Sequence, residues 1–177
     1  MACKEFTLWQ LILLIFICSL IFIVLIPPFS KARDRAALKS TIIDLQHWSQ
    51  AISCYIIEYS QVPPSPAGQI NYKKSLVKEI LPYLRVLRIK DWWGYPLWIW
   101  TGKGIDQYGI KTVENKEFVL ASLGKKGEIE SWKYDPEHPQ SGIFYVESAL
   151  DYENDLVIWN GRFIRAPGTF SKIIMEP

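Results

Sequence analysis

The sequence contains few of the residues that build metal sites and disulfide frameworks. Its 177 residues include 2 histidines and 3 cysteines, which are scattered along the chain. Zinc sites and disulfide scaffolds need closely spaced ligands or regular cysteine pairs, so we expect neither here. An excess of one charge is missing as well, because 20 basic residues are matched by 18 acidic ones and leave a net charge of +2. Domains that bind nucleic acid normally carry a strongly basic face, so we expect no nucleic-acid partner.

Motifs of catalysis are also missing. The sequence has no paired carboxylates at catalytic spacing, no nucleophile elbow and no phosphate-binding loop. These are the patterns by which common enzyme sites are recognised, so we expect a protein that is not an enzyme. The composition, with 49% apolar and 21% charged residues, is that of a folded globular chain.

One long apolar run lies near the N-terminus. Residues 8–26 are apolar except for Gln10 and Ser19. A helix of this length is roughly 28 Å long, close to the thickness of a bilayer core. The run is longer than the core of a secretory signal and ends in bulky residues 27–29 instead of a small-residue cleavage site. This pattern predicts a retained transmembrane helix over residues 6–29.

The helical pattern continues beyond the apolar run. From residue 30 to residue 60, apolar residues recur every three or four positions, which predicts an amphipathic helix that continues the first one. Pro27 is the expected position of a kink. The apolar face consists of Ile42, Leu45, Trp48, Ile52, Tyr55, Ile56 and Tyr59.

Residues 61–177 have the pattern of a globular α+β head. A loop rich in proline over residues 61–68 is followed by a predicted short helix over residues 72–87. The later chain is rich in short aromatic and β-branched segments bounded by turn residues, which is typical of strands. The predicted strands are 97–100, 118–122, 143–146 and 156–159. They are expected to form a small antiparallel sheet that packs on the long helix.

Several local patterns, taken together, resemble one protein family. Phe6-Thr7-Leu8 resembles the processing motif of prepilins, and Pro27 stands where pilin-like helices usually carry a proline. The turn that contains Asp91, Trp93, Gly94 and Pro96 resembles the Asp-Pro-Trp-Gly-x-Pro turn of major pseudopilins of type II secretion systems. The family also has counterparts of the segments 118–127 and 154–159. The chain is therefore similar to the major pseudopilins, within the type IV pilin-like family.

The resemblance implies a pilin-like fold and a structural function. Pseudopilins assemble through their N-terminal helices into a short filament based in the inner membrane. We therefore expect the chain to pack against itself or other pilin-like subunits, and to meet secretion-system assembly proteins. The expected location is the bacterial inner membrane, with a single span and the head in the periplasm. Basic residues just after the apolar run favour the opposite orientation by the positive-inside rule, and we let the resemblance outweigh them.

Two residues depart from the processing motif. Glu5 stands where the family has glycine before the cleaved bond, and a charged side chain there is expected to block the prepilin peptidase. Gln10 stands where the family has a glutamate that pairs with the free α-amine of a neighbouring subunit. If residues 1–5 stay attached as an uncleaved leader, no α-amine forms at Phe6 and the glutamate is not needed. The alternative function is therefore an unprocessed bitopic membrane protein whose head binds a partner or a surface glycan.

A degenerate calcium loop is the last expectation. Related major pseudopilins hold calcium between their final strands, but here Lys126 stands at the position of one acid and Asn154 replaces another. Only Asp155 matches, and calcium needs six to eight oxygen ligands. We expect that Lys126 pairs with Asp155 and that the head folds without calcium or any other cofactor. The alternative is that Lys126 points into solvent and that packing of Tyr134, Phe144 and Tyr152 closes the loop.

Overall fold

The computed structural model describes residues 8–64, 67–71, 75–102, 105–111 and 114–170. The chain divides into two compact units, Met1–Ala36 and Ala37–Pro177.

The longest element is helix α1, Leu8–Tyr59. It is helical through Pro27 and Pro28 and ends at a left-handed residue, Ser60, with a φ of 56°. The amide of Ser60 donates to the carbonyl of Ile56 at 2.8 Å, which satisfies one of the free carbonyls at the helix end. The predicted end of the helix near residue 60 is confirmed.

The prediction of a membrane-spanning half is wrong. Among the residues that the structure describes, no helix is both long enough and apolar enough to cross a membrane. The described apolar side chains run from Leu8 to Ile21, which is roughly 21 Å of helix at about 1.5 Å per residue, and charged residues begin at Lys31. The transmembrane helix over residues 6–29 and the single-pass location in the inner membrane, with a periplasmic head, are corrected on this finding.

The second unit contains a six-stranded sheet with the order β1-β2-β3-β5-β6-β4. All neighbouring strands are antiparallel except β4 and β6, which are parallel, so the sheet is mixed and not antiparallel throughout as predicted. The strands are β1 (Gly68–Gln69), β2 (Trp98–Thr101), β3 (Phe118–Ser122), β4 (Ile143–Phe144), β5 (Leu156–Trp159) and β6 (Arg162–Pro167). Sequence patterns located β3 and β5 at their observed bounds and missed β1 and β6.

The remaining helices are short. The predicted helix over residues 72–87 is much shorter, because Pro82 lies in a 3₁₀ turn, after which the chain becomes extended. The short helices are α2 (Ser75–Ile80), η1 (Leu81–Tyr83), η2 (Gln107–Gly109), η3 (Pro139–Gly142), η4 (Leu150–Glu153) and η5 (Gly168–Phe170).

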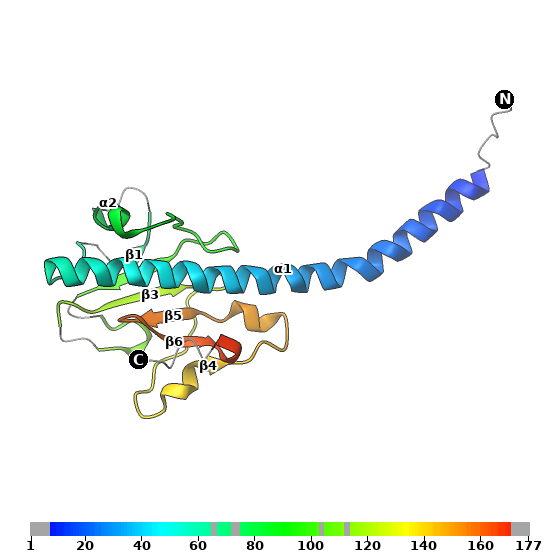
Figure 1. Ribbon diagram of the computed structural model, residues 1–177. Coiled ribbons are helices and arrows are strands. Elements are labelled where there is room, and N and C mark those ends of the chain that lie inside the picture. Colours follow the sequence, from blue (N-terminus) through cyan, green and yellow to red (C-terminus); the bar gives the residue numbers. More distant parts are fainter. Residues whose placement is uncertain (1–7, 65–66, 72–74, 103–104, 112–113, 171–177) are drawn as a thin grey trace. The chain divides into compact units, whose positions relative to one another are not determined.

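The main core lies between the sheet and the helices. In the second unit, the last turns of α1 lie between the sheet and α2 (Figure 1). Leu45, Trp48 and Ile52 of α1 are at most 1% exposed, as the helical spacing predicted. They share one cluster with Ile99, Leu120 and Ile158 from three neighbouring strands, and with Leu76 and Ile80 of α2.

The opposite face of the sheet carries a second, aromatic layer. Tyr108 from η2 and Trp132 from the β3–β4 connection (residues 123–142) cover this face. The rings contact one another in a chain from Trp98 to Trp159, with centroids about 5.7–6.5 Å apart. Side chains on both faces of the sheet are therefore buried, and the described residues that cover the second face come from loops and the short 3₁₀ helix η2.

Candidate functional site

The turn that resembles the pseudopilin motif is organised by Asp91, which is 3% exposed. One carboxylate oxygen accepts hydrogen bonds from the amides of Trp93 and Tyr95 at 3.0 and 2.8 Å. The other accepts from the hydroxyl of Ser122 on β3 at 2.8 Å. Burial raises the pKa of Asp91, while the hydrogen bonds to Ser122 and the turn amides act against that rise. The carboxylate thus shapes its own turn and fastens the turn to the sheet.

The other motif residues of this turn have conformational roles. Gly94 has a φ of 98°, which a residue with a side chain adopts only with strain, and its amide donates to the carbonyl of Asp91. Pro96 follows the turn, where Lys90 forms an isolated antiparallel bridge with it. Trp93 packs against the main core.

Trp92 fastens the same turn to α1. Its backbone amide donates to the hydroxyl of Thr41 at 3.2 Å, and its indole nitrogen donates to the carboxylate of Asp44 at 2.8 Å. The guanidinium of Arg88 lies 4.1 Å from the centre of the ring, and it also pairs with Asp44 at 3.3 Å. Trp92 is 46% exposed, but these contacts occupy its donor and cover part of its ring, which leaves a poor platform for a glycan.

Asp155 lies at the end of the sheet and is completely buried. One of its oxygens accepts from the hydroxyl of Tyr108 at 2.7 Å and from the amide of Glu130 at 3.0 Å. Its other oxygen, Oδ1, has no hydrogen-bond partner among the described residues. Burial raises the pKa of Asp155 to about 6, against the effect of the two hydrogen bonds. The same burial, together with the neighbouring carboxylate, raises the pKa of Tyr108.

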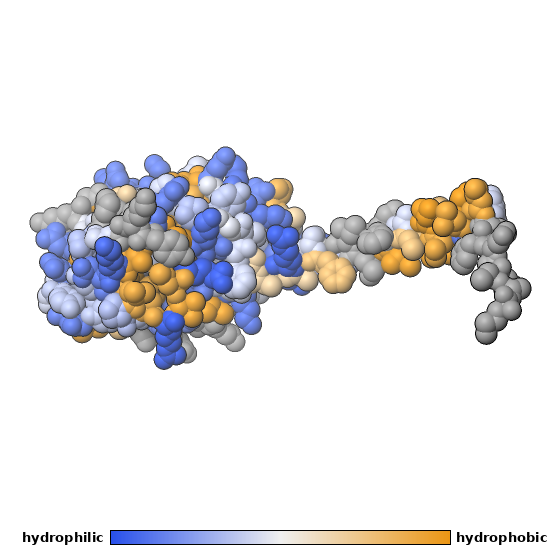
Figure 2. Space-filling model, turned by 90° about the horizontal axis from the view of Figure 1, so that it is seen from above, coloured by the Kyte–Doolittle hydropathy of each residue, from blue (hydrophilic) through white to orange (hydrophobic). Residues whose placement is uncertain are grey.

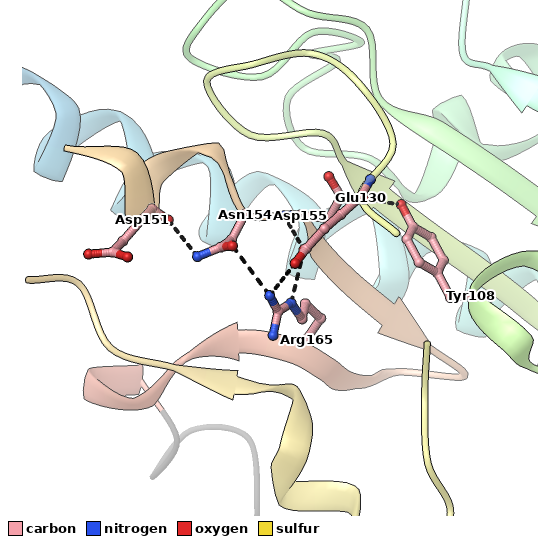
Figure 3. Close-up of polar contacts among 6 residues, drawn as sticks. All are labelled: Tyr108, Glu130, Asp151, Asn154, Asp155 and Arg165. Atoms are coloured by element: carbon pink, nitrogen blue, oxygen red, sulfur yellow. Dashed lines mark hydrogen bonds and ion pairs between the residues drawn. The ribbon is translucent and has the colours of Figure 1, made fainter. Parts of the chain in front are cut away.

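Arg165 of β6 supplies the positive charge next to this aspartate. Its side chain is 9% exposed, and it donates to both carboxylate oxygens of Glu130, at 2.6 and 3.2 Å. It also donates to the amide oxygen of Asn154 at 3.3 Å (Figure 3). The amide nitrogen of Asn154 in turn donates to the carbonyl of Asp151 at 3.1 Å. The oxygens of Glu130 and Asn154 therefore converge on a guanidinium.

Lys126 does not pair with Asp155 as predicted. Its ammonium pairs with Glu128 at 2.9 Å, and its side chain is 55% exposed. The alternative from the sequence is closer to the structure, because Tyr152 and Phe144 are buried, at 4% and 9% exposure. Lys126 lies in a solvent-exposed turn. Arg165 belongs to β6, where it stands opposite Val157 of β5.

The residues present do not fit a calcium ion. Glu130 and Asn154 already direct their oxygens at a cation that is part of the chain, and a second cation next to the guanidinium would be repelled. Among the described residues, no group of three or more histidine, cysteine or acidic side chains is placed to hold a metal. Lys126, Asn154 and Asp155 thus do not come together as a loop around an ion.

Sequence reasoning missed three participants in this cluster. Arg165, Glu130 and Tyr108 are separated from Asp155 by 10 to 47 positions, and no local pattern joins them. The one local signal is that Arg165 stands among apolar residues in the segment Arg162–Pro167, which is buried or half-buried from Phe163 onward. Such a residue must find a partner, since an unpaired buried charge is costly.

The predicted processing motif is only partly described. Glu5, Phe6 and Thr7 lie outside the described residues, and Leu8 and Gln10 lie in the first turn of α1. All described side chains from Leu8 to Ile21 are exposed. The large apolar ones among them have exposures between 46% and 77%.

A shallow cleft of about 230 Å³ lies beside the last turns of α1. Its lining includes His47, Cys54, Tyr83 and Arg85. The hydroxyl of Tyr83 donates to Glu58, and this bond, with burial, raises the pKa of the phenol. The histidine and the cysteine are two helical turns apart, so they do not form a nucleophile and base pair.

Comparisons with known proteins add no match, since no family model, no curated protein and no solved structure matches this chain.

Proposed function

We propose that this protein is a structural subunit, similar to a pseudopilin, that assembles with other copies or with pilin-like subunits through the N-terminal part of α1. In this proposal it belongs to a type II secretion or related type IV filament system, meets that system's assembly proteins, and catalyses no reaction. The choice of family is supported by the resemblance of the Asp91 turn and of the segment around Asp155 to pseudopilins. Assembly through α1 is supported by the exposed apolar side chains of its N-terminal part.

The observation that carries the proposal is the exposed apolar surface of α1. Leu8, Trp9 and Ile15 are 76%, 77% and 61% exposed, and no charged residue occurs between Leu8 and Ile21. In Figure 2 the described residues at this end of the helix are mostly coloured as hydrophobic. A helix that is apolar on all sides is stable when it is covered on all sides. Neighbouring copies of the same helix provide such a cover, since the side-chain ridges of one apolar helix pack into the grooves of another.

Cys18 offers a direct test of this packing. It is an exposed free cysteine in the apolar segment, and Cys54 is an exposed free cysteine in the second unit. A full-length chain that keeps Cys18 alone, with Cys3→Ser and Cys54→Ser, should form covalent dimers with a short thiol cross-linker in the native cells. A matched chain that keeps Cys54 alone should give much less dimer, because the proposal places the helices, and not this face, in contact.

A charged substitution distinguishes a dimer formed by packing of the helices from cross-links formed by random encounters between chains. Ile15→Arg in the chain that keeps Cys18 alone should abolish the dimer, because a buried unpaired charge is costly. The second unit should keep its melting temperature, since Ile15 is not part of its core. Mass spectrometry of the cross-linked product should identify a second copy or another pilin-like chain. A chain that remains uncross-linked, or a partner without a pilin-like N-terminus, would contradict the proposal.

The N-terminus of the native protein tests the processing part of the proposal. Because Glu5 is expected to block cleavage, peptides that span Glu5 and Phe6 should be found by mass spectrometry of the native chain. Glu5→Gly should permit cleavage in a host with a prepilin peptidase. A native chain that begins at Phe6 would show that residues 1–5 are removed despite Glu5, and it would leave the assembly proposal intact.

A further inference from the structure

Arg165 joins segments that are far apart in the chain. It extends from β6 and contacts Glu130 in the β3–β4 connection and Asn154 in the turn before β5. Its guanidinium also lies 5.1 Å from the ring centres of both Trp132 and Phe144. One side chain therefore links β6 with the β3–β4 connection, with β4 and with the start of β5.

The charges of this cluster explain why a cation is needed. Glu130 and Asp155 bring two carboxylates together, and the amide of each residue donates to the carboxylate of the other, at 3.0 and 3.3 Å. Asp155 is completely buried, and Glu130 is exposed only in part. Buried carboxylates are stable when a cation or several donors compensate for the lost water. Among the described residues, Arg165 is the cation that pairs with Glu130, and its charge also favours the ionised form of Asp155.

We infer that Arg165 is a built-in structural cation, which closes the β3–β4 connection over the end of the sheet without any divalent ion. Its planar guanidinium binds both oxygens of one carboxylate, which a lysine at the same position cannot do. A guanidinium also keeps its charge over the whole physiological pH range and cannot be removed by a chelator. The fold of the second unit is therefore independent of the concentration of divalent ions.

Thermal melting of the full-length chain tests this inference. Arg165→Met removes the charge and keeps much of the volume, and it should lower the melting temperature by about 10 °C, because it leaves the carboxylates without their cation. Arg162→Met is the matched control, since Arg162 is an exposed arginine of the same strand. This control should change the melting temperature by no more than about 2 °C. An Arg165→Met chain that melts with the control would overturn the inference.

The effect of divalent ions on the melting temperature distinguishes a cation role of Arg165 from a role in packing alone. The wild-type chain should melt at the same temperature in millimolar calcium and in excess chelator. Arg165→Ala removes the guanidinium and leaves space next to the oxygens of Glu130 and Asn154. This variant should therefore gain stability in calcium, since an ion that binds the folded state raises its melting temperature. If Arg165→Ala is unfolded in chelator, addition of calcium should restore its folded spectrum.

Arg165→Lys separates charge from geometry. Lysine keeps the charge but offers one donor group in place of the fork, so its melting temperature should lie between those of the wild type and Arg165→Met. A wild-type chain that melts at a higher temperature in calcium would contradict the inference. Arg165→Ala with the same melting temperature in calcium and chelator would also contradict it, because the oxygens would then not be arranged around a cation.

Discussion

Asp91, in the turn that precedes β2, and Asp155, directly before β5, are both buried carboxylates, but their partners come from different parts of the chain. The amides that donate to Asp91 lie within four positions of it, and both of its oxygens are satisfied. Asp155 accepts from Tyr108 and Glu130, which are 47 and 25 positions away, and its Oδ1 has no partner among the described residues. The turn amides therefore satisfy one oxygen of Asp91, and a single long-range bond from Ser122 satisfies the other. All the partners of Asp155 lie far away in the chain, and one of its oxygens keeps no partner among the described residues.

The largest effect is expected at Asp91. Asp91→Ala leaves the amides of Trp93 and Tyr95 and the hydroxyl of Ser122 without their acceptor, and it should lower the free energy of unfolding by about 4 kcal/mol. Chemical denaturation of the full-length chain measures this loss. Asp106→Ala, at an exposed aspartate whose side chain does not cap its turn, is the control and should lose less than about 1 kcal/mol. Equal losses at Asp91 and Asp106 would show that the hydrogen bonds of the buried carboxylate add no more stability than an exposed aspartate does.

The second effect is the pH dependence that Asp155 introduces. Its pKa is about 6 in the folded state against 3.8 for the unperturbed side chain, so between about pH 4 and 6 the folded state holds a proton that the unfolded state has lost. The free energy of unfolding should therefore fall as the pH rises through this window, by about 3 kcal/mol in all. Below pH 4 both states are protonated, and above pH 6 the loss is complete.

Asp155→Asn checks this assignment. The amide is neutral at every pH, so the slope between pH 4 and 6 should become smaller. It should not vanish, because burial also raises the pKa of Asp91 and gives a contribution of the same sign. Denaturation curves at several pH values measure the slope. An Asp155→Asn chain with the slope of the wild type would show that another group is responsible.

Gly94, in the Asp91 turn, and Gly124, next to the Asp155 cluster, should differ in the stability that is lost when each is replaced by alanine. A Cβ on Gly124 would lie 2.7 and 2.8 Å from the backbone oxygens of Asn154 and Tyr152, and the φ of this glycine is 60°. A Cβ on Gly94 would meet nothing within 4 Å, so only its φ of 98° is unfavourable. Gly124→Ala should cost about 3 kcal/mol and Gly94→Ala about 1 kcal/mol. Thermal melting ranks the two variants, and a larger loss for Gly94→Ala would contradict the packing described for the loop.

The smallest effect is expected at Trp92. Trp92→Phe keeps an aromatic ring over Arg88 and removes the indole donor to Asp44, in a place that is half open to water. The expected loss is about 0.5 kcal/mol, because water replaces an exposed hydrogen bond at little cost. Denaturation in low and high salt should give the same loss to within that amount. A loss as large as that of Asp91→Ala would mean that the indole hydrogen bond holds the turn as strongly as the carboxylate does.

Local patterns in the sequence predicted a large part of this fold. The end of α1, the strands β3 and β5, and the buried face that contains Leu45, Trp48 and Ile52 all follow from helical or alternating spacing. The membrane-spanning helix was the main error, and the extra length predicted for α2 was a smaller one. The helix predicted over residues 72–87 was too long because its apolar pattern was extended past Pro82.

The turn around Asp91 follows from the sequence, because a carboxylate and the amides it binds lie within a few residues and their geometry is a property of that short segment. The cluster around Asp155 depends on the tertiary structure. Sheet register places Arg165 opposite Val157, and the β3–β4 connection must return across the sheet before Glu130 can meet them. The sequence contains a lysine at the expected position and an arginine elsewhere, and it does not show which of the two is buried. Burial decides that choice, since a cation that is shielded from water by β6 and Trp132 interacts with a carboxylate far more strongly than an exposed lysine does.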